Sequence, residues 1–246
     1  MQPRKQRVLI LNDGRDCGAP YAPLFKHLGE ITHDVATFKL QPLTFRLLVF
    51  TGGSDVSPDL YGDTSPNNWC HSNPKRDAEE HDVFKFARQR GVRMVGICRG
   101  MQFLNVMTGG KIMHDINGHG SGSHETMTKD RDEPFMTNSF HHQMCIPHKD
   151  TQILAWSHKK LSKSYIGDKD RPIDYKGPEV EAIYNSIDKI IGVQWHPEAT
   201  PDSGKWIAAT NWFRHLVKDY IDVDVLKFKR LYLGMEGARV SVREAH

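Results

Sequence analysis

The chain has 246 residues, of which 38% are hydrophobic and 26% are charged, and its formal net charge is +3. This length and composition predict a folded domain with a sizeable core. The small, dispersed charge argues against a nucleic-acid-binding protein, and no run approaches the roughly 18–20 apolar residues of a membrane span. Residues 1–7 do not resemble a signal peptide, so we expect a cytoplasmic protein with reduced thiols.

Apolar strands alternate with helical patterns through the first half of the chain. The strands predicted there are Arg7–Leu11, Asp34–Phe38, Arg46–Phe50 and Val92–Ile97. The predicted helices are Asp77–Arg90 and Gly100–Met107. This alternation is typical of an α/β protein with a parallel sheet, in which functional residues stand where the strands end.

After Gly110 the pattern changes to short segments typical of antiparallel strands. These segments are Lys111–Ile116, Met136–Gln143, Thr151–Trp156, Val180–Tyr184 and Ile190–Trp195. An amphipathic helix is predicted over Gly204–Tyr220. We therefore expect an α/β fold with a central, mostly parallel sheet, flanking helices and an additional antiparallel segment. Residues 1–220 are predicted to form one domain, and residues 221–246 a C-terminal extension to which the sequence assigns no role.

Residues 93–105 place one cysteine between a buried strand and a helix. Gly96 and Gly100 flank Cys98, and such small neighbours allow the sharp strand-to-helix turn that presents a nucleophile. The N-terminus of the following helix then faces the sulfur and favours its reactive thiolate form. A buried structural cysteine is the alternative, because a motif of this kind is only a hypothesis by itself.

A histidine and a carboxylate follow a second apolar strand near the end of the chain. His196 ends that segment, and Glu198 stands two residues later. A thiol nucleophile needs a base, and the imidazole of that base needs an anion to fix its tautomer and stabilise its charged form. A lone histidine at a strand end is more often structural, but Cys98 upstream and Glu198 beside it favour a catalytic triad.

A glycine pair follows the strand predicted at Arg46–Phe50. At Gly52 and Gly53 no Cβ blocks the backbone, so N–H groups can turn toward a ligand. Acyl transfer needs such donors for the developing oxyanion, and we expect them from the backbone amides of Gly53 and Arg99. Most Gly-Gly pairs after a strand are simple turns, and this one gains weight from the two motifs that follow it.

Together these motifs resemble those of the class I glutamine amidotransferase superfamily, in particular its γ-glutamyl hydrolase branch (γ-glutamyl-γ-aminobutyrate hydrolase-like proteins, grouped with cysteine peptidases). The superfamily signature Gly-hydrophobic-Cys-x-Gly-x-Gln stands at Gly96–Gln102, and His-Pro-Glu stands at 196–198. Features similar to the branch are the oxyanion loop Thr51–Pro58 with Tyr61, then Arg76, Asp77 and Glu80, and the substrate-side segment Asn138–Gln143. The resemblance covers residues 7–216 and implies a flavodoxin-like class I glutamine amidotransferase fold.

The resemblance implies a cysteine-dependent hydrolase of a γ-glutamyl amide bond, with a small-molecule substrate and no cofactor. Cys98 would form a γ-glutamyl thioester, His196 would move the proton, Glu198 would orient His196, and water would release glutamate. The alternative is a glutaminase subunit that delivers ammonia to a synthetase partner. Arg99 and the oxyanion loop favour the hydrolase, and a non-catalytic relative is disfavoured because every triad position is filled. The sequence indicates neither the leaving amine nor the oligomeric state.

Three further residues are expected at the substrate: Gly52, Gln102 and His141. Gln102 would shape the pocket from the first turn of the helix, with simple packing as the alternative. His141 would contact the glutamyl group or the leaving amine, by resemblance to the substrate-side segment of the family. The alternative for His141 is a solvent-facing histidine on a strand, because histidine is intermediate in burial.

Some segments depart from the branch or are specific to this chain. His114-Asp115 stands where a Gln-Asp pair is common, and residues 117–133 are interpreted as a long polar loop. Asp13–Tyr21 and Ser54–Lys75 are expected near the mouth of the site. The second of these is either a lid over the substrate or a surface connection, since long loops are functional only in some cases.

The cysteine and histidine patterns give no sign of a metal. The four cysteines, at positions 17, 70, 98 and 145, form no CxxC motif, and Cys17 is expected to be a bystander. The fourteen histidines are scattered except for His141-His142, and adjacent strand residues point to opposite faces. We therefore expect no metal, because no three ligands at a known spacing are present.

Overall fold

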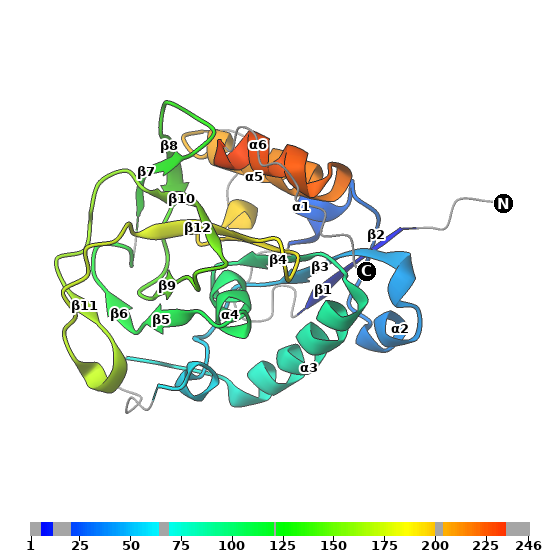
Figure 1. Ribbon diagram of the computed structural model, residues 1–246, viewed down its shortest axis with the longest axis horizontal. Helices are drawn as coiled ribbons and strands as arrows, with labels where there is room; N and C mark the ends of the chain where they lie inside the picture. The colour runs from blue at the N-terminus through cyan, green and yellow to red at the C-terminus, as the bar shows by residue number, and fades with distance from the viewer. Residues whose placement is uncertain (1–5, 12–20, 64–68, 121, 200–203, 235–246) are drawn as a thin grey trace, which may run out of the picture.

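A nine-stranded sheet forms the centre of the computed structural model, which describes residues 6–11, 21–63, 69–120, 122–199 and 204–234. Five neighbouring strands are parallel, in the order β2 (Glu30–Thr32), β1 (Arg7–Leu11), β3 (Phe45–Phe50), β4 (Met94–Ile97) and β13 (Ile190–Val193). Antiparallel strands continue the same sheet (Figure 1), in the order β12 (Val180–Asn185), β10 (Gln152–Ser157), β7 (Ser123–Thr128) and β8 (Phe135–Asn138). Two small sheets pair β6 (Asp115–Ile116) with β11 (Tyr165–Ile166), and β5 (Lys111–Met113) with β9 (Met144–Ile146).

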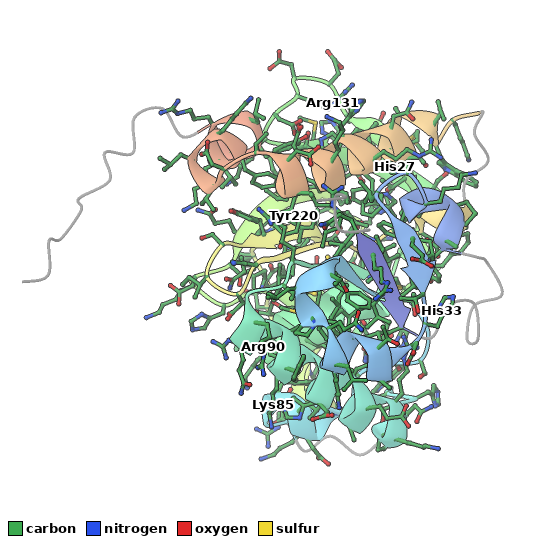
Figure 2. All side chains as sticks on the ribbon, turned by 90° about the vertical axis from the view of Figure 1, so that its right-hand side faces the viewer. His27, His33, Lys85, Arg90, Arg131 and Tyr220 are labelled. Carbon is green, nitrogen blue, oxygen red and sulfur yellow. The ribbon has the colours of Figure 1, made fainter. Side chains whose placement is uncertain are left out.

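Helices cover both faces of the parallel half of the sheet and give the molecule three layers (Figure 1). One layer contains α1 (Ala22–Phe25), α5 (Ile207–Asp222) and α6 (Val225–Leu233). The opposite layer contains α2 (Val35–Leu40), α3 (Pro74–Arg90) and α4 (Arg99–Met107). Figure 2 shows the two layers edge-on, with Lys85 and Arg90 of α3 at one side and Tyr220 of α5 toward the other. Four short 3₁₀ turns complete the described structure: η1 (Pro42–Thr44), η2 (Pro58–Tyr61), η3 (Asp168–Asp170) and η4 (Pro197–Ala199).

Strand β1 shows why the central strands are apolar throughout. Its successive side chains point to opposite faces of the sheet. Val8 and Ile10 join the core under α1, α5 and α6, whereas Leu9 and Leu11 join the core under α2, α3 and α4. Because helices cover both faces, each face needs apolar residues. Polar functional residues are therefore confined to the ends of these strands.

The strand predicted at Asp34–Phe38 is wrong, because this segment forms helix α2. Asp34 is the N-cap, and its carboxylate accepts hydrogen bonds from Ala36 N at 2.9 Å and Thr37 N at 3.1 Å. These bonds satisfy amides that a helix start leaves unpaired, and they outweigh the β propensity of Thr37 and its neighbours. The edge strand is instead β2, Glu30–Thr32, which pairs in parallel with β1.

The loop expected over residues 117–133 contains strand β7. Its side chains alternate in burial, and the inward ones (His124, Thr126 and Thr128) are all polar. Thr126 Oγ1 lies 2.9 Å from Thr137 Oγ1 of β8, within hydrogen-bonding distance. Polar side chains that satisfy one another can occupy an inner face, so hydrophobic alternation does not reveal this strand.

Helix α5 continues to Asp222, so the domain boundary expected after residue 220 falls inside this helix. Helix α6 then places Phe228, Tyr232 and Leu233 in the core beside α5.

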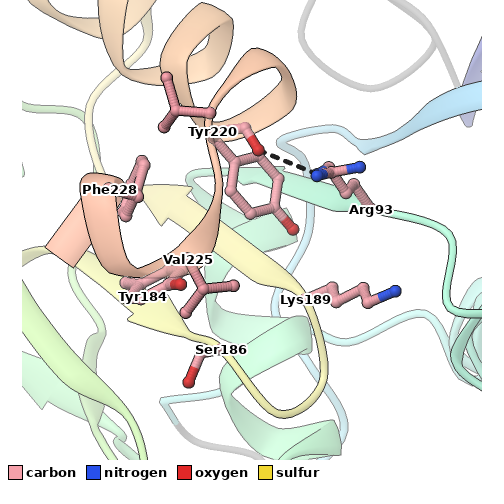
Figure 3. Close-up of a pocket in the computed structure, with 8 residues that line it drawn as sticks. Arg93, Tyr184, Ser186, Lys189, Tyr220, Val225 and Phe228 are labelled. Atoms are coloured by element: carbon pink, nitrogen blue, oxygen red, sulfur yellow. Dashed lines mark hydrogen bonds between the residues drawn. The ribbon is translucent and has the colours of Figure 1, made fainter. Parts of the chain in front are cut away.

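A cavity of about 40 Å³ lies under α6, next to the residues that precede β4 and β13. There Arg93 Nε donates to Tyr220 O at 2.9 Å (Figure 3). Among the described residues, no helix combines the length and the apolar character that a membrane span needs.

Candidate active site

Cys98 occupies a strained turn between β4 and α4. Its backbone angles are φ 51° and ψ −113°, a combination that residues with a side chain rarely adopt. The turn is crowded, since a Cβ on Gly100 would lie 2.0 Å from Phe50 O. Cys98 is the N-cap residue of α4, and the positive end of that helix stabilises negative charge on the sulfur.

Strand β13 brings His196 to the same edge of the sheet. β13 pairs in parallel with β4, so the residues that follow the two strands meet at their carboxyl ends. His196 Nδ1 donates to Glu198 Oε1 at 2.6 Å, which leaves Nε2 for Cys98. The side chain of Asn138 fixes the backbone of His196, because it accepts from His196 N and donates to His196 O, each at 2.8 Å.

The surroundings of His196 favour its charged form. Burial alone would lower the pKa of His196, but the charge of Cys98 and hydrogen bonds with Cys98 and Glu198 raise that pKa to about 11. An imidazolium can therefore pair with a thiolate at neutral pH. Cys98 and His196 are only 6% and 8% exposed, so water screens this ion pair little.

The Gly52–Gly53 turn lies against the Cys98–His196 pair. Gly52 N donates to the phenol oxygen of Tyr21 at 3.0 Å, and Gly52 O accepts from Arg76 at 2.9 Å. Because C=O and N–H of a trans peptide point in opposite directions, the N–H of Gly53 faces away from Arg76. No residue in the described part of the chain accepts a hydrogen bond from Gly53 N or Arg99 N. Both amides are thus available to an oxyanion.

A buried ion cluster on α3 holds this turn in place. Arg76 donates to Thr51 O at 2.9 Å as well as to the glycine turn, and its Nε pairs with Glu80 at 2.8 Å. The guanidinium of Arg99 is buried and pairs with both Asp77 and Glu80. Removing one member of such a cluster leaves a buried charge without compensation. The side chain of Arg99 is therefore committed to this cluster, and its contribution to the reaction would come from its backbone amide.

Gln102 and His141 are buried close to the triad. Gln102 Nε2 donates to Gln143 O at 3.3 Å and to Gln194 Oε1 at 3.2 Å. His141 Nδ1 donates to Gln143 O at 2.9 Å, and burial lowers the pKa of His141 to about 3, so its ring is neutral. These contacts favour the packing alternative for Gln102. A substrate contact by His141 stays a prediction.

Four residues beside the candidate triad have contacts to which the sequence assigned no individual role. Gln194 Nε2 donates to Cys98 Sγ at 3.5 Å, and Tyr21 and Asn138 hold the glycine turn and the base. Phe140 is 50% exposed, and its ring centroid lies 6.1 Å from that of His196. The sequence could have indicated a role for Gln194 only through its position just before the His-Pro-Glu motif. Tyr21 and Asn138 stand at the ends of two segments that the sequence placed near the site, Asp13–Tyr21 and Asn138–Gln143.

The segment Ser54–Lys75 is packed against the domain where the structure describes it. Tyr61 is buried, and its hydroxyl lies 3.2 Å from His114 Nε2, which also lies 3.0 Å from Asp63 Oδ2. These contacts favour a packed connection over a free lid. Residues 64–68 of this segment lie outside the described residues, as do residues 12–20 with Cys17.

The structure describes two other cysteines. Cys70 and Cys145 are both buried. Burial raises the pKa of Cys70 to about 12 and raises that of Cys145 well above its ordinary value. Because the thiolate is the reactive form, neither thiol is set up to act as a nucleophile.

A thiol at a strand-to-helix turn, with a His-Glu pair after the neighbouring parallel strand, defines a site of the class I glutamine amidotransferase type. Residues 34–153 match the Peptidase C26 family. The chain is 32% identical over 172 residues to the glutamine amidotransferase-like protein YvdE of Lactococcus lactis, in an alignment that covers 62% of this chain and 66% of that protein. It is 26% identical over 180 residues to the γ-glutamyl-CDP-amidate hydrolase of Campylobacter jejuni, covering 71% and 72%.

The solved structure of a glutamine amidotransferase from Thermotoga maritima has a TM-score of 0.53 at 14% identity, covering 94% of this chain and 90% of that one. The chain is also similar in sequence to a synthetase component, the carbamoyl phosphate synthase small chain of Maridesulfovibrio salexigens. The two are 30% identical in an alignment that covers 51% of this chain and 30% of that protein. The chain spans between about half and two thirds of the length of the first curated relatives that it matches. These findings confirm the predicted family and the flavodoxin-like α/β fold, and they support cysteine-type amide hydrolysis in general.

Proposed function

We propose that the protein hydrolyses a γ-glutamyl amide bond through a thioester on Cys98. The observation that carries the proposal is the sequence of contacts from Glu198 through His196 to Cys98, beside the free amides of Gly53 and Arg99. Acyl transfer needs a nucleophile, a base and oxyanion donors in one place. The match to Peptidase C26, and the similarity to a protein named γ-glutamyl-CDP-amidate hydrolase, support a glutamyl amide as the substrate.

The reaction follows from the charges of the pair. The Cys98 thiolate attacks the carbonyl carbon, and the carbonyl oxygen takes the electron pair while the amides of Gly53 and Arg99 donate to it. The C–N bond then breaks, and the His196 imidazolium gives its proton to the leaving amine. Water next adds to the thioester with neutral His196 as its base, and glutamate leaves as the S–C bond breaks. Glu198 keeps the imidazole in the tautomer that both steps need.

The leaving amine is assigned to the side of Phe140. His196 must reach the departing nitrogen to protonate it, so the rest of the amine extends past the His196 ring. Phe140 lies beside that ring and is half exposed. An exposed aromatic ring favours a leaving group with an apolar or planar part. The substrate is thus a small γ-glutamyl amine rather than glutamine itself.

A second candidate is a glutaminase subunit that passes ammonia to a synthetase partner. The similarity to a carbamoyl phosphate synthase small chain favours it. In that case the isolated chain would be nearly inactive, and free glutamine would be its substrate in the complex. Either reaction fits a reducing, cytoplasmic setting, because Cys70, Cys98 and Cys145 are all free thiols.

The test is glutamate release by the isolated chain from a panel of γ-glutamyl amines, with glutamine included and Cys98→Ala as the blank. We expect turnover of at least one γ-glutamyl amine and a lower kcat/KM for glutamine. Phe140→Ala should raise KM for amines with a ring more than it lowers kcat, whereas Leu43→Ala, a change at another exposed apolar residue, should alter neither. A chain that is inert on every γ-glutamyl amide, yet releases ammonia from glutamine once a synthetase is added, would establish the second candidate.

A further inference from the structure

Three histidines and a glutamate converge in the antiparallel half of the molecule. They are His119, His124, His141 and Glu181, and one nitrogen or oxygen from each lies within 4.8 Å of those of the others. All four side chains are more than nine-tenths buried. They come from separate segments: the loop after β6, strand β7, the segment after β8, and strand β12. The ring of His119 lies 4.9 Å from that of His124 and 4.8 Å from that of His141, centroid to centroid.

The spacing of these atoms matches a small tetrahedral site. From Glu181 Oε1, the distances are 3.6 Å to His119 Nδ1, 3.2 Å to His124 Nε2 and 3.8 Å to His141 Nε2. A tetrahedral zinc ion with ligands at about 2.0–2.1 Å sets neighbouring ligand atoms about 3.3 Å apart. An ion at the centre of the cluster would therefore require only small side-chain movements.

The outward nitrogen of each histidine already has an acceptor. His119 Nε2 lies 3.1 Å from Glu179 Oε2, His124 Nδ1 lies 3.2 Å from Glu125 O, and His141 Nδ1 lies 2.9 Å from Gln143 O. Because these partners only accept hydrogen bonds, each outward nitrogen carries the hydrogen in the neutral ring. The inward nitrogen of each ring then presents a lone pair to the centre. Carboxylate and carbonyl acceptors behind the ring orient the histidine ligands of metals in this way.

Of the inward atoms, His119 Nδ1 lies 3.4 Å from Ser139 Oγ, and the others form no hydrogen bond within the described part of the chain. His124 Nε2, His141 Nε2 and both carboxylate oxygens of Glu181 are buried and form no hydrogen bond with any described residue. A buried carboxylate facing imidazole lone pairs is unfavourable. One extra proton on a histidine would satisfy a single contact, whereas a divalent cation would satisfy all four ligands.

We propose that His119, His124, His141 and Glu181 bind a divalent transition-metal ion, with zinc favoured by the donor set. Three imidazoles and one carboxylate suit zinc, and four protein ligands complete a tetrahedron. Such a site has no open position for water, so its role is structural rather than hydrolytic. The proposal replaces the expectation of no metal, which rested on sequence spacing alone. It also replaces the predicted substrate contact by His141, because both ring nitrogens of His141 would be occupied.

The position of the cluster indicates what the ion would hold. Glu181 O accepts from Gln194 N at 2.8 Å, and the side chain of Gln194 reaches Cys98. His141 stands three residues after Asn138, which holds the backbone of the catalytic histidine. The ion would therefore tie the segments around the catalytic site to strand β12. This inference does not depend on which amide is hydrolysed.

The first experiment measures the metal content of the untagged chain, purified from cells grown with added zinc. We expect about one zinc ion per chain by elemental mass spectrometry, as a closed four-ligand site requires. Dialysis against a chelator should lower Tm, and added Zn²⁺ should restore it in a concentration-dependent way. Addition of Co²⁺ to the chelated chain should give the intense visible absorption of a tetrahedral site.

Variants then locate the ion. Glu181→Gln and His124→Ala should purify without metal, whereas His148→Ala, a change to a histidine outside the cluster, should bind it like the parent. Glu179→Gln removes the charge of the carboxylate behind His119, which also accepts from Leu161 N, Ser162 N and the hydroxyl of Tyr165, and should weaken zinc binding by about 10–100-fold. The Zn²⁺ and Co²⁺ titrations of the chelated parent keep the test decisive if these variants fail to fold.

Two results would overturn the proposal. In the first, the chelated parent binds neither Zn²⁺ nor Co²⁺ and its Tm is indifferent to both. In the second, Glu179→Gln and Glu181→Gln retain metal as well as His148→Ala does. Neither result touches the hydrolysis proposed for Cys98, because metal content and Tm are measured without a substrate.

Discussion

Substitution of Gly52 by alanine tests the geometry of the site without removing a reactive group. A Cβ at this position would lie 2.8 Å from His196 Cε1 and 2.9 Å from the hydroxyl of Tyr21, whereas ordinary contact begins at 3.4 Å. The imidazole must therefore move by about 0.6 Å or more, away from its alignment with Cys98. A misplacement of about 1 Å can cost 10²-fold in rate. We expect kcat/KM to fall by about 10–100-fold, or about 1.4–2.7 kcal/mol of transition-state stabilisation.

The assay compares Gly52→Ala with the parent in steady-state hydrolysis and in thermal unfolding. Overpacking a buried position costs about 1–3 kcal/mol, so Tm should fall by about 2–12 °C while the chain stays folded at 25 °C. Gly120→Ala is the control, because nothing lies within 4 Å of a Cβ there. It should match the parent in both measurements. A folded Gly52→Ala variant with the kcat/KM of the parent would show that this turn does not lie against the catalytic base as described.

The remaining predictions concern the thiols and the base. Cys98→Ser should abolish turnover without loss of fold, and a glutamine-like electrophile should label Cys98 before Cys70 or Cys145, as peptide mass spectrometry would show; labelling of the other two first would contradict the assignment. The pKa of His196, raised to about 11, predicts a charged imidazole beside Cys98 at neutral pH, so His196→Asn should slow the alkylation of Cys98 at pH 7. An alkylation rate equal to the parent's would refute the ion pair. By linkage, the raised pKa of His196 contributes to the free energy of unfolding, fully below about pH 6.5 and progressively less toward pH 11. Urea unfolding across that pH range would detect the loss. Glu198→Gln should retain about 10–100 times more activity than His196→Asn, and an activity equal to the parent's would reduce the triad to a dyad.

The sequence predicted the positions of the strands that carry the site because their burial on both faces leaves an unbroken apolar run. The antiparallel pairing expected for Ile190–Trp195 is wrong on one side, because β13 pairs in parallel with β4. The expected strand Arg7–Leu11 coincides with β1, and the expected helix Gly100–Met107 differs from α4 by one residue. Local chemistry also predicted which residues could form a triad, and the structure places them at one edge of the sheet. Each of these strands and motifs is a run of neighbouring residues in the chain.

Tertiary contacts explain what the sequence could not predict. A single capping carboxylate, Asp34, turned an expected strand into α2, and polar partners concealed β7. The segment expected as one strand at Lys111–Ile116 is divided between β5 and β6, which belong to different small sheets. The histidine cluster was equally hidden, because its members lie on four segments that only the folded sheet brings together. Spacing rules for metal sites apply to ligands on neighbouring turns and do not reach such a set.

The backbone strain at Cys98 bears on how this gene would evolve without the reaction. Glycine accepts φ 51° and ψ −113° without a steric penalty, whereas any other residue there costs about 1–3 kcal/mol. Selection for stability alone would therefore replace the cysteine by glycine. A lineage released from the need for catalysis should drift toward that change, and its protein should unfold at a higher temperature. Retention of a cysteine in this conformation is therefore expected only where the proposed reaction is needed.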